Sequence, residues 1–486
     1  MRRTWTDLTA CGSISEQKAN IFLMNLEEKL RQLKQAAQKS TRDRELERQL
    51  EYLRRREHVP KTLPSQRVPR GIDAYVEGQV STNDWGGYFS TRQALPFGRP
   101  YGKLRIGELS TADFKPLELF LENAAMPATS GLVYLDTETT GLVGERGACA
   151  FLVGIGSAEG SQFVLRQFFL RDYAEEKAML AALAETLAPY KAIVTFNGKA
   201  FDLPLLESRY ALKRMKPPFA RLVHLDLLHP ARRLWKLRLE SCQLTHLERE
   251  VLDVRRQGDV CGSEIPGIYF DYLRTGNAHG LQPVFYHNSL DVITTAALGA
   301  ELARVVSNGW SAGWSNGWGA TEGDNGGASV LESSLDLFSL SRIFDRAGVR
   351  DQAVATCQRA LAVGLPESIQ TRALRHLACQ HKRRREYEAA AEIWTELARR
   401  ESDVAIGALE ELAIYYERRR RDTKTALKFV KAALEKVRAN SGSDSRLRSL
   451  THRLERLRRK AAARQRRSKP ALEGTTDRAG VGERRT

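Results

Sequence analysis

Val133-Tyr134-Leu135-Asp136-Thr137-Glu138-Thr139-Thr140-Gly141 combines a strand-like apolar pattern with two acidic residues. An apolar run at 132–135 leads into Asp136 and Glu138. On a β-strand, residues i and i+2 point to the same face, so the two carboxylates are expected side by side. Adjacent carboxylates repel each other unless a cation lies between them, and their oxygens suit hard ions such as Mg²⁺ or Mn²⁺. Taken alone, however, such a pair is more often two solvated acids where a strand runs into a polar turn.

Two further carboxylates follow downstream in comparable positions. Asp202 comes after the apolar run 192–196 and a glycine-containing turn, so it is expected near the start of a helix. Asp291 and His287 are four residues apart at the start of a later helix, where they share one face. Taken singly, each site has an ordinary interpretation as a helix cap or a polar first turn.

The segment 131–305 alternates strand-like and helix-like patterns. We predict strands at 132–136, 149–156, 162–169, 191–196 and 221–227, and helices at about 174–188, from about 202 and from near 284. Three strands followed by a helix, a strand, a helix and a strand predict an α/β domain with a mixed β-sheet.

The remainder of the chain divides by composition. We expect a charged N-terminal helix at 1–60, an extended lead-in packing on the α/β domain at 61–130, a Gly/Ser/Trp linker at 306–329, helical repeats at 330–440 and a basic, largely disordered tail at 441–486. In the repeat segment, Leu340, Leu377 and Leu412 recur at similar intervals, and a set of alanines does the same. This pattern resembles the tetratricopeptide (TPR) repeat, with an ordinary helical bundle as the alternative.

Composition narrows the class of protein. The 486 residues carry a net charge of +17, and 14 basic against 5 acidic residues lie between 441 and 486, which favours a polyanionic partner. No apolar run is long enough for a membrane span, and no apolar segment follows the N-terminal arginines as in a secretory signal. Six scattered cysteines favour free thiols in a reducing compartment. We therefore expect a cytoplasmic protein that binds nucleic acid and has no membrane segment.

The sequences around the four acidic residues resemble, in their order along the chain, the motifs of the DEDD exonucleases, which belong to the ribonuclease-H-like superfamily. The run 136–142, Asp-Thr-Glu-Thr-Thr-Gly-Leu, is similar to the first motif, and 197–202 is similar to the second. Asp291, preceded by His and Tyr, is similar to the third. Further matches at 150–154, 224–228 and 259–269 and the C-terminal repeats resemble the YprB-like family of predicted nucleases. The resemblance implies a ribonuclease-H-like mixed β-sheet flanked by helices, followed by an all-α TPR-like domain.

The resemblance also implies a chemistry. In these families two divalent metal ions, Mg²⁺ or Mn²⁺, promote hydrolysis of phosphodiester bonds. By this resemblance Asp136, Glu138, Asp202 and Asp291 are the expected metal ligands, with Asp136 and Glu138 also counted as catalytic. The expected activity is that of a 3′–5′ exonuclease acting on DNA or RNA.

The group that serves the attacking water departs from the family pattern. One DEDD subgroup places His five residues before the last Asp, and the other places Tyr four residues before it. Here Tyr286 is five residues before Asp291 and His287 is four before it. Helical spacing favours His287 as the base, and a neutral imidazole is in general the better base at neutral pH.

Several other residues are weaker candidates for the site. Thr137, Asn197 and Lys199 are expected to contact substrate, although Lys199 is equally an ordinary turn lysine. Asp226 is interpreted mainly as a structural hydrogen-bond acceptor, with an auxiliary ligand as the alternative. The basic residues Arg232, Arg233, Arg255 and Arg256 are interpreted either as a nucleic-acid path or as ordinary surface charge.

Two other functions remain open at this stage. A structure-selective endonuclease would use the same carboxylates. A TPR scaffold would carry a nuclease fold that binds nucleic acid without cutting it, and its repeats would bind a protein partner. The sequence does not distinguish DNA from RNA or single from double strands.

Overall fold

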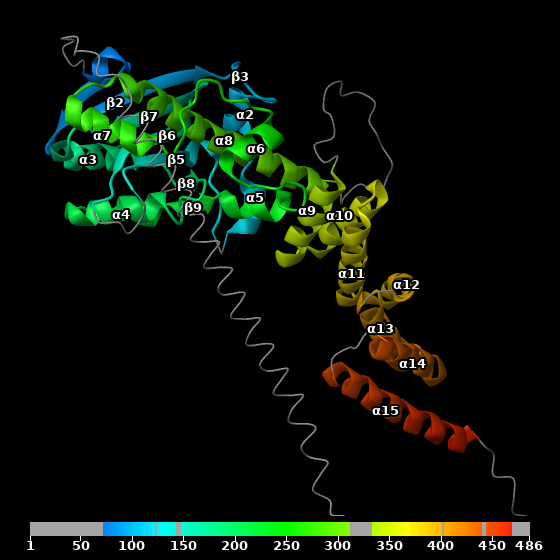
Figure 1. Cartoon of the computed structure of the whole chain (residues 1–486). Coiled ribbons are helices and arrows are strands. Elements are labelled where there is room, and N and C mark those ends of the chain that lie inside the picture. Colours follow the sequence, from blue (N-terminus) through cyan, green and yellow to red (C-terminus); the bar gives the residue numbers. More distant parts are fainter. Residues whose placement is uncertain are drawn as a thin grey trace, which may run out of the picture. The chain divides into compact units, whose positions relative to one another are not determined.

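The computed structural model describes residues 71–121, 124–141, 147–311, 333–400, 403–439 and 444–468 (Figure 1). The N-terminal helix expected at 1–60 lies outside these residues, and so does the linker segment 312–332 with two of its tryptophans.

A seven-stranded mixed sheet forms the centre of the α/β part, in the order β1-β2-β7-β6-β5-β8-β9. The strands are β1 (Gln79–Asn83), β2 (Gly86–Pro96), β5 (Leu132–Thr139), β6 (Ala150–Glu159), β7 (Gln162–Phe169), β8 (Ala192–Thr195) and β9 (Val223–Asp226). β5 pairs antiparallel with β6 and parallel with β8, and β8 pairs parallel with β9. The predicted mixed sheet is therefore confirmed, and the five predicted strands agree with β5 to β9 within a few residues.

The segment expected to be an extended lead-in is part of the sheet instead. β2 runs antiparallel to β7, with Phe89 opposite Phe169 and Pro96 opposite Gln162, and β1 adds an edge strand. A short hairpin of β3 (Pro100–Tyr101) and β4 (Leu104–Arg105) and the helix α2 (Ile106–Thr111) follow. The expectation was wrong because polar residues interrupt the apolar pattern of β2, whose pairing partner lies far away in the sequence.

Six longer helices accompany the sheet. They are α3 (Glu176–Leu187), α4 (Asp202–Leu212), α5 (Leu228–Trp235), α6 (Leu244–Leu252), α7 (Ile265–Thr275) and α8 (Gln282–Ser311). α8 continues past the expected linker start at 306 because Val305 and Val306 are buried and prolong its apolar face. Among all the helices that the structure describes, none combines the length and the apolar character needed to cross a bilayer.

The alternation along β5 divides its side chains between two hydrophobic cores. Leu132 and Tyr134 belong to the core that contains residues of α5, α6 and α8. Val133 and Leu135 belong to the core that contains residues of α3, α4 and α7. Because strand side chains alternate with a period of two, Asp136 follows Tyr134 on the α8 side of the sheet.

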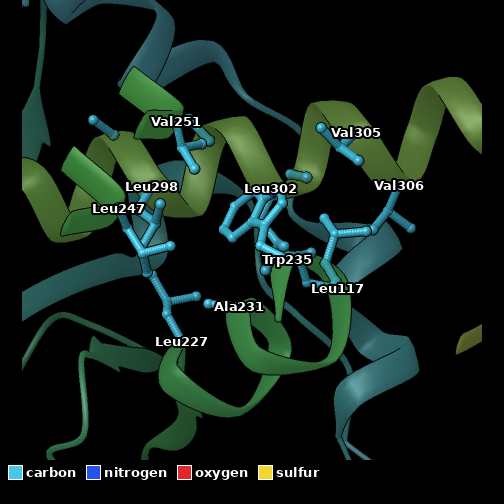
Figure 2. Close-up of a cluster of buried hydrophobic side chains, with 14 of the residues drawn as sticks. Leu117, Leu227, Ala231, Trp235, Leu247, Val251, Leu298, Leu302, Val305 and Val306 are labelled. Atoms are coloured by element: carbon cyan, nitrogen blue, oxygen red, sulfur yellow. The ribbon is translucent and has the colours of Figure 1, made fainter. Parts of the chain in front are cut away.

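The apolar face of α8 holds the first core together. Figure 2 shows Leu298 and Leu302 of α8 beside Trp235 of α5 and Leu247 of α6. All four side chains are buried to 98% or more. The contacts fix α8, which carries two of the candidate site residues, against the helices next to the sheet.

An all-helical region follows the α/β part, as expected. Its helices are α9 (Ser334–Arg346), α10 (Arg350–Val363), α11 (Glu367–Arg383), α12 (Tyr387–Ala398), α13 (Asp403–Arg418), α14 (Thr423–Ala439) and α15 (Asp444–Ser468), coloured yellow to red in Figure 1. The recurring residues Leu340, Leu377 and Leu412 are buried, one in every second helix. The periodic small residues Ala353 and Ala390 are fully buried in the helices between them.

The tail expected to be largely disordered begins with a helix of 25 residues, α15. Leu450 and Leu457 are buried in a core with residues of α13 and α14. The expectation for 444–468 was wrong because the many arginines outweigh one apolar stripe in the composition of this segment. The stripe is nevertheless enough to pack a helix.

The core contact of α8 gives a stability prediction. Replacing Leu302 by Ala leaves a cavity beside Trp235, so we expect the free energy of unfolding to fall by about 2–5 kcal/mol. The matched control is Leu212→Ala, at a side chain that is 67% exposed, with an expected change within about 0.5 kcal/mol. Chemical denaturation followed by circular dichroism measures both, and equal effects would contradict the packing described here.

Candidate metal centre

Asp136 lies on β5 opposite Gly154 of β6. A Cβ atom at position 154 would lie 2.1 Å from Oδ1 of Asn288, so glycine is what allows this α8 residue to approach the sheet. Asn288 is fully buried and donates from Nδ2 to Oδ2 of Asp136 at 2.9 Å. The register of β5 and β6 therefore places Gly154 where Asn288 of α8 can reach the carboxylate of Asp136.

Asp202 reaches the same region as the first residue of α4, directly after the turn that follows β8. Asn197 has a left-handed backbone with φ of 67°, which Asn tolerates better than most residues. Asp226 accepts from the backbone N–H groups of Asn197 at 2.8 Å and Lys199 at 3.0 Å, and thus fixes the turn. Thr137 Oγ1 donates to Oδ1 of Asp202 at 2.6 Å. These hydrogen bonds agree with the structural interpretation of Asp226.

His287 and Asp291 project from one face of α8, as their spacing predicts. His287 Nδ1 lies 2.8 Å from Oδ1 of Asp259, and Nε2 lies 3.5 Å from Oδ2 of Asp291. Since a carboxylate accepts the bond, Nδ1 carries the hydrogen, and in a neutral ring the lone pair is then on Nε2. Ligand atoms of Glu138, His287 and Asp291 all lie within 4.8 Å of one another.

Arg256 is buried beside the carboxylates rather than free for nucleic acid. Its side chain is 8% exposed, and it pairs with Glu248 at 2.6 Å and with Asp259 at 3.0 Å. It also forms a short ion pair with Asp291. The sequence-based interpretation of Arg256 as a surface or path residue was therefore wrong, because the acids that surround it come from distant parts of the chain.

Three carboxyl groups of this site, those of Asp136, Glu138 and Asp202, resist ionisation. Burial, followed by the charges of Asp291 and Asp202, raises the pKa of Glu138 to about 8. Burial and the same two neighbours hold the pKa of Asp136 well above its ordinary value, although the hydrogen bond from Asn288 opposes the shift. Burial also raises the pKa of Asp202 to about 6. Arg256 compensates part of this charge, and an excess of negative charge remains.

This donor set fits hard divalent cations. Four carboxylates and one imidazole offer oxygen and nitrogen ligands of the kinds that Mg²⁺ and Mn²⁺ accept. The mutual repulsion that raises the pKa of Glu138 and Asp136 is relieved when a cation lies between the groups. The chemistry of the side chains and their electrostatics thus point to the same class of ligand.

The cavities around the cluster show which of the weaker candidate residues lie at the site. A cavity of about 640 Å³ is lined by Asp136, Asp291 and Asn197, together with Arg232 and Lys236. Lys199 lines a different cavity of about 450 Å³, with Asp226 and Arg233 among its neighbours. Asn197 therefore lies at the candidate site, whereas the Lys199 side chain does not share its cavity. Tyr286 is 43% exposed, in contrast to the neighbouring His287 side chain at 14%.

Two residues of this site were not found from the sequence. Asn288 had a weak signal, because a glycine inside an apolar strand, Gly154, indicates the close approach of another group. Asp259 begins the family match at 259–269, but no role at the site was predicted for it, because it lies between α6 and α7 and meets His287 only in the fold.

Comparison with known proteins agrees with the fold. Residues 133–303 match the RNase_H_2 family model of the RNase_H superfamily. The chain is also similar to the uncharacterized protein YprB of Bacillus subtilis (strain 168), with 27% identity over 333 residues. That similarity covers 68% of this chain and 75% of YprB. Residues 133–303 thus form an RNase H superfamily domain, which supports a hydrolase acting on nucleic acid.

The electrostatics predict how the protein responds to the loss of one carboxylate. Replacing Glu138 by Gln removes a repelled charge, so the variant should melt at a higher temperature than the native protein in EDTA at pH 8. Mn²⁺ should raise the melting temperature of the native protein more than that of the variant. Differential scanning fluorimetry measures both shifts, and Glu207→Gln, at an exposed position on α4, is the control. A lower melting temperature of Glu138→Gln in EDTA would contradict this account.

A second prediction concerns Arg256. Removing its charge leaves Glu248, whose side chain is 1% exposed, without its ion-pair partner, so Arg256→Met should lower the free energy of unfolding by about 3–5 kcal/mol. The control is Arg249→Met, which breaks an exposed ion pair to Glu250 and should change the free energy of unfolding far less. Urea denaturation in EDTA compares them, and a neutral Arg256→Met would show that the buried pairs are not needed.

Proposed function

We propose that this RNase H superfamily domain is a divalent-metal-dependent nuclease, which by its motifs acts as a 3′–5′ exonuclease. The observation that carries the proposal is the convergence of carboxylates from β5, α4 and α8 beside His287. Asp136 and Asp291 line one open cavity with Arg232 and Lys236, so acidic and basic groups face the same space. That combination suits a phosphodiester together with the cations that neutralise it.

Asp136, Glu138, Asp202 and Asp291 are the residues that would hold the metal. When bound, divalent ions lower the pKa of water and offset the negative charge that develops on the phosphate. Hydrogen bonds from neighbouring residues hold two of these carboxylates in place. Thr137 donates to Asp202, and Asn288 donates to Asp136, so two of the four are oriented by neutral donors from neighbouring elements.

His287 is the proposed base. Its Nδ1–H donates to Asp259, which leaves the Nε2 lone pair free to accept a proton from water. Nε2 lies 3.5 Å from Asp291, on the side of the carboxylate cluster. Asp259 thus acts through His287 by holding the ring and its tautomer, as the third member of a nucleophile–base–orienter arrangement does.

Arg232 and Lys236 are the proposed phosphate contacts of the cavity. Arg232 is an exposed residue of α5, Lys236 is an exposed residue directly after its end, and both line the cavity that Asp136 also lines. Guanidinium and ammonium groups donate to phosphate oxygens without reading base identity. Asn197, in the turn after β8, lines the same cavity and offers a further polar contact.

The test is cleavage of end-labelled single- and double-stranded DNA and RNA with Mg²⁺ or Mn²⁺. We expect stepwise shortening from the 3′ end that stops in EDTA. Asp136→Asn should bring the rate below detection, and His287→Gln should lower it by roughly 10²–10⁴-fold, which is the usual contribution of a general base. His229→Gln, at an exposed histidine outside this cavity, is the matched control and should keep the native rate.

Other outcomes select the alternatives. Internal cuts that depend on Asp136 would favour a structure-selective endonuclease. Binding without cleavage of any of the four substrates would favour a scaffold and contradict the proposed function.

A further inference from the structure

A second cavity lies between α5 of the nuclease domain and α9, the first helix of the C-terminal helical region. Its volume is about 280 Å³. Five cationic side chains line it: Arg232, Arg233 and Lys236 from α5 and its C-terminal end, and Arg342 and Arg346 from α9. We call these five residues the basic pocket. A concave site with five cations and no carboxylate in its wall is suited to an anion.

The charge of the basic pocket is not neutralised within the part of the chain that the structure describes. None of its five cations forms an ion pair there with a described carboxylate, although acids lie on the same helix. Asp336 pairs with Arg238 at 2.8 Å, and Asp345 pairs with Arg383 at 2.8 Å. Burial and the nearby charges of Arg372 and Arg346 lower the pKa of Arg342. The cations therefore repel one another in the absence of a bound anion.

A neutral donor in the wall adds an independent sign of a ligand. Ser339 of α9 is 1% exposed and lines the basic pocket. Its hydroxyl has no hydrogen-bond partner among the residues that the structure describes. A buried hydroxyl without a partner costs free energy, and an anionic oxygen in the pocket would satisfy it.

The pocket is built into the packing of α9. Leu337 and Leu340 of α9 belong to the same hydrophobic core as Leu302 of α8. An ion pair between Asp336 of α9 and Arg238, just after α5, joins α9 to the end of α5. These contacts hold the arginines of α9 opposite those of α5.

The basic pocket shares two of its residues with the cavity of the candidate metal centre. Arg232 and Lys236 line both the 280 Å³ cavity and the 640 Å³ cavity that contains Asp136 and Asp291. A single isolated phosphate would not need cations in both places. A polyanion that reaches the carboxylates would instead pass along α5 and meet Arg342 and Arg346.

We propose that α5 and α9 form one phosphate-binding surface for the nucleic-acid strand, so that the first C-terminal helix is part of the substrate site. The inference rests on the proposed function for the identity of the strand. Guanidinium groups match phosphate oxygens in pairs, which favours a sugar–phosphate backbone as the occupant. The surface sets how much of the strand beyond the cleavage position is held.

The test is binding of fluorescein-labelled single-stranded DNA and RNA to the full chain in EDTA, measured by anisotropy over a range of salt concentrations. Arg342→Gln/Arg346→Gln should weaken binding of a 20-nucleotide strand about tenfold. The slope of log K against log salt should become less steep by roughly 1.4, because each phosphate contact to a single strand contributes about 0.7. Binding of a tetranucleotide should change less than twofold. Circular dichroism and thermal melting confirm that the variant is folded.

The matched control is Arg418→Gln/Arg420→Gln, two exposed arginines at the end of α13 and in the turn after it. The control removes the same charge and should change neither affinity nor slope appreciably. An equal effect of the two double variants would overturn the proposal, and so would the absence of binding by the native chain. Competition by poly-glutamate as effective as that by a nucleic acid of equal charge would also overturn it, in favour of an acidic protein partner.

Cleavage separates this inference from the proposed function. Native cleavage together with an unchanged slope in Arg342→Gln/Arg346→Gln would overturn the surface alone. A changed slope without cleavage by the native chain would support the surface and contradict the nuclease.

Discussion

Several carboxyl groups lie close together at one end of the sheet, where burial and mutual repulsion both oppose their ionisation. The pKa of Glu138 is raised to about 8 by these two causes, and that of Asp136 is raised as well. A fold tolerates such a cluster when compensating charge is supplied. Arg256 supplies part of it through its contacts with Asp291 and Glu248. The negative charge that remains favours the binding of a cation. The same repulsion between carboxylates therefore explains both the electrostatic cost of the site and its proposed function.

The placement of the cluster follows from ordinary packing. Tyr134 of β5 points into a core, and Asp136, two residues later on the same strand, points to the same side of the sheet. The apolar face of α8 then packs on the sheet and on α5 and α6, and this packing brings Asn288 and Asp291 to the strand end. The same core extends to α9. The carboxylates and the basic pocket therefore depend on a single set of buried contacts, which connects the RNase H superfamily domain with the first helix of the C-terminal region.

The sequence predicts local features of this protein better than distant ones. The strand at 132–136 and the helix face shared by His287 and Asp291 follow from periodicity within a few residues. β2 was missed because its pairing with β7 joins segments far apart in the chain. The prediction for Arg256 was wrong for the same reason, since its burial and ion pairs involve Asp291 and Glu248, which are distant in the sequence or on another element. α15 was missed because its arginines conceal one apolar stripe in the composition.

Titration calorimetry of the full chain with Mn²⁺, without nucleic acid, measures whether the carboxylate cluster binds a divalent cation. We expect binding to the native chain that is lost or strongly weakened in Asp136→Asn, because that carboxylate lies among Glu138, Asp202 and Asp291. We also expect binding to weaken as the pH falls below the pKa of Glu138, since protons then compete for the same oxygens. Equal binding by the native chain and Asp136→Asn, or no binding by either, would show that these carboxylates do not form a metal site.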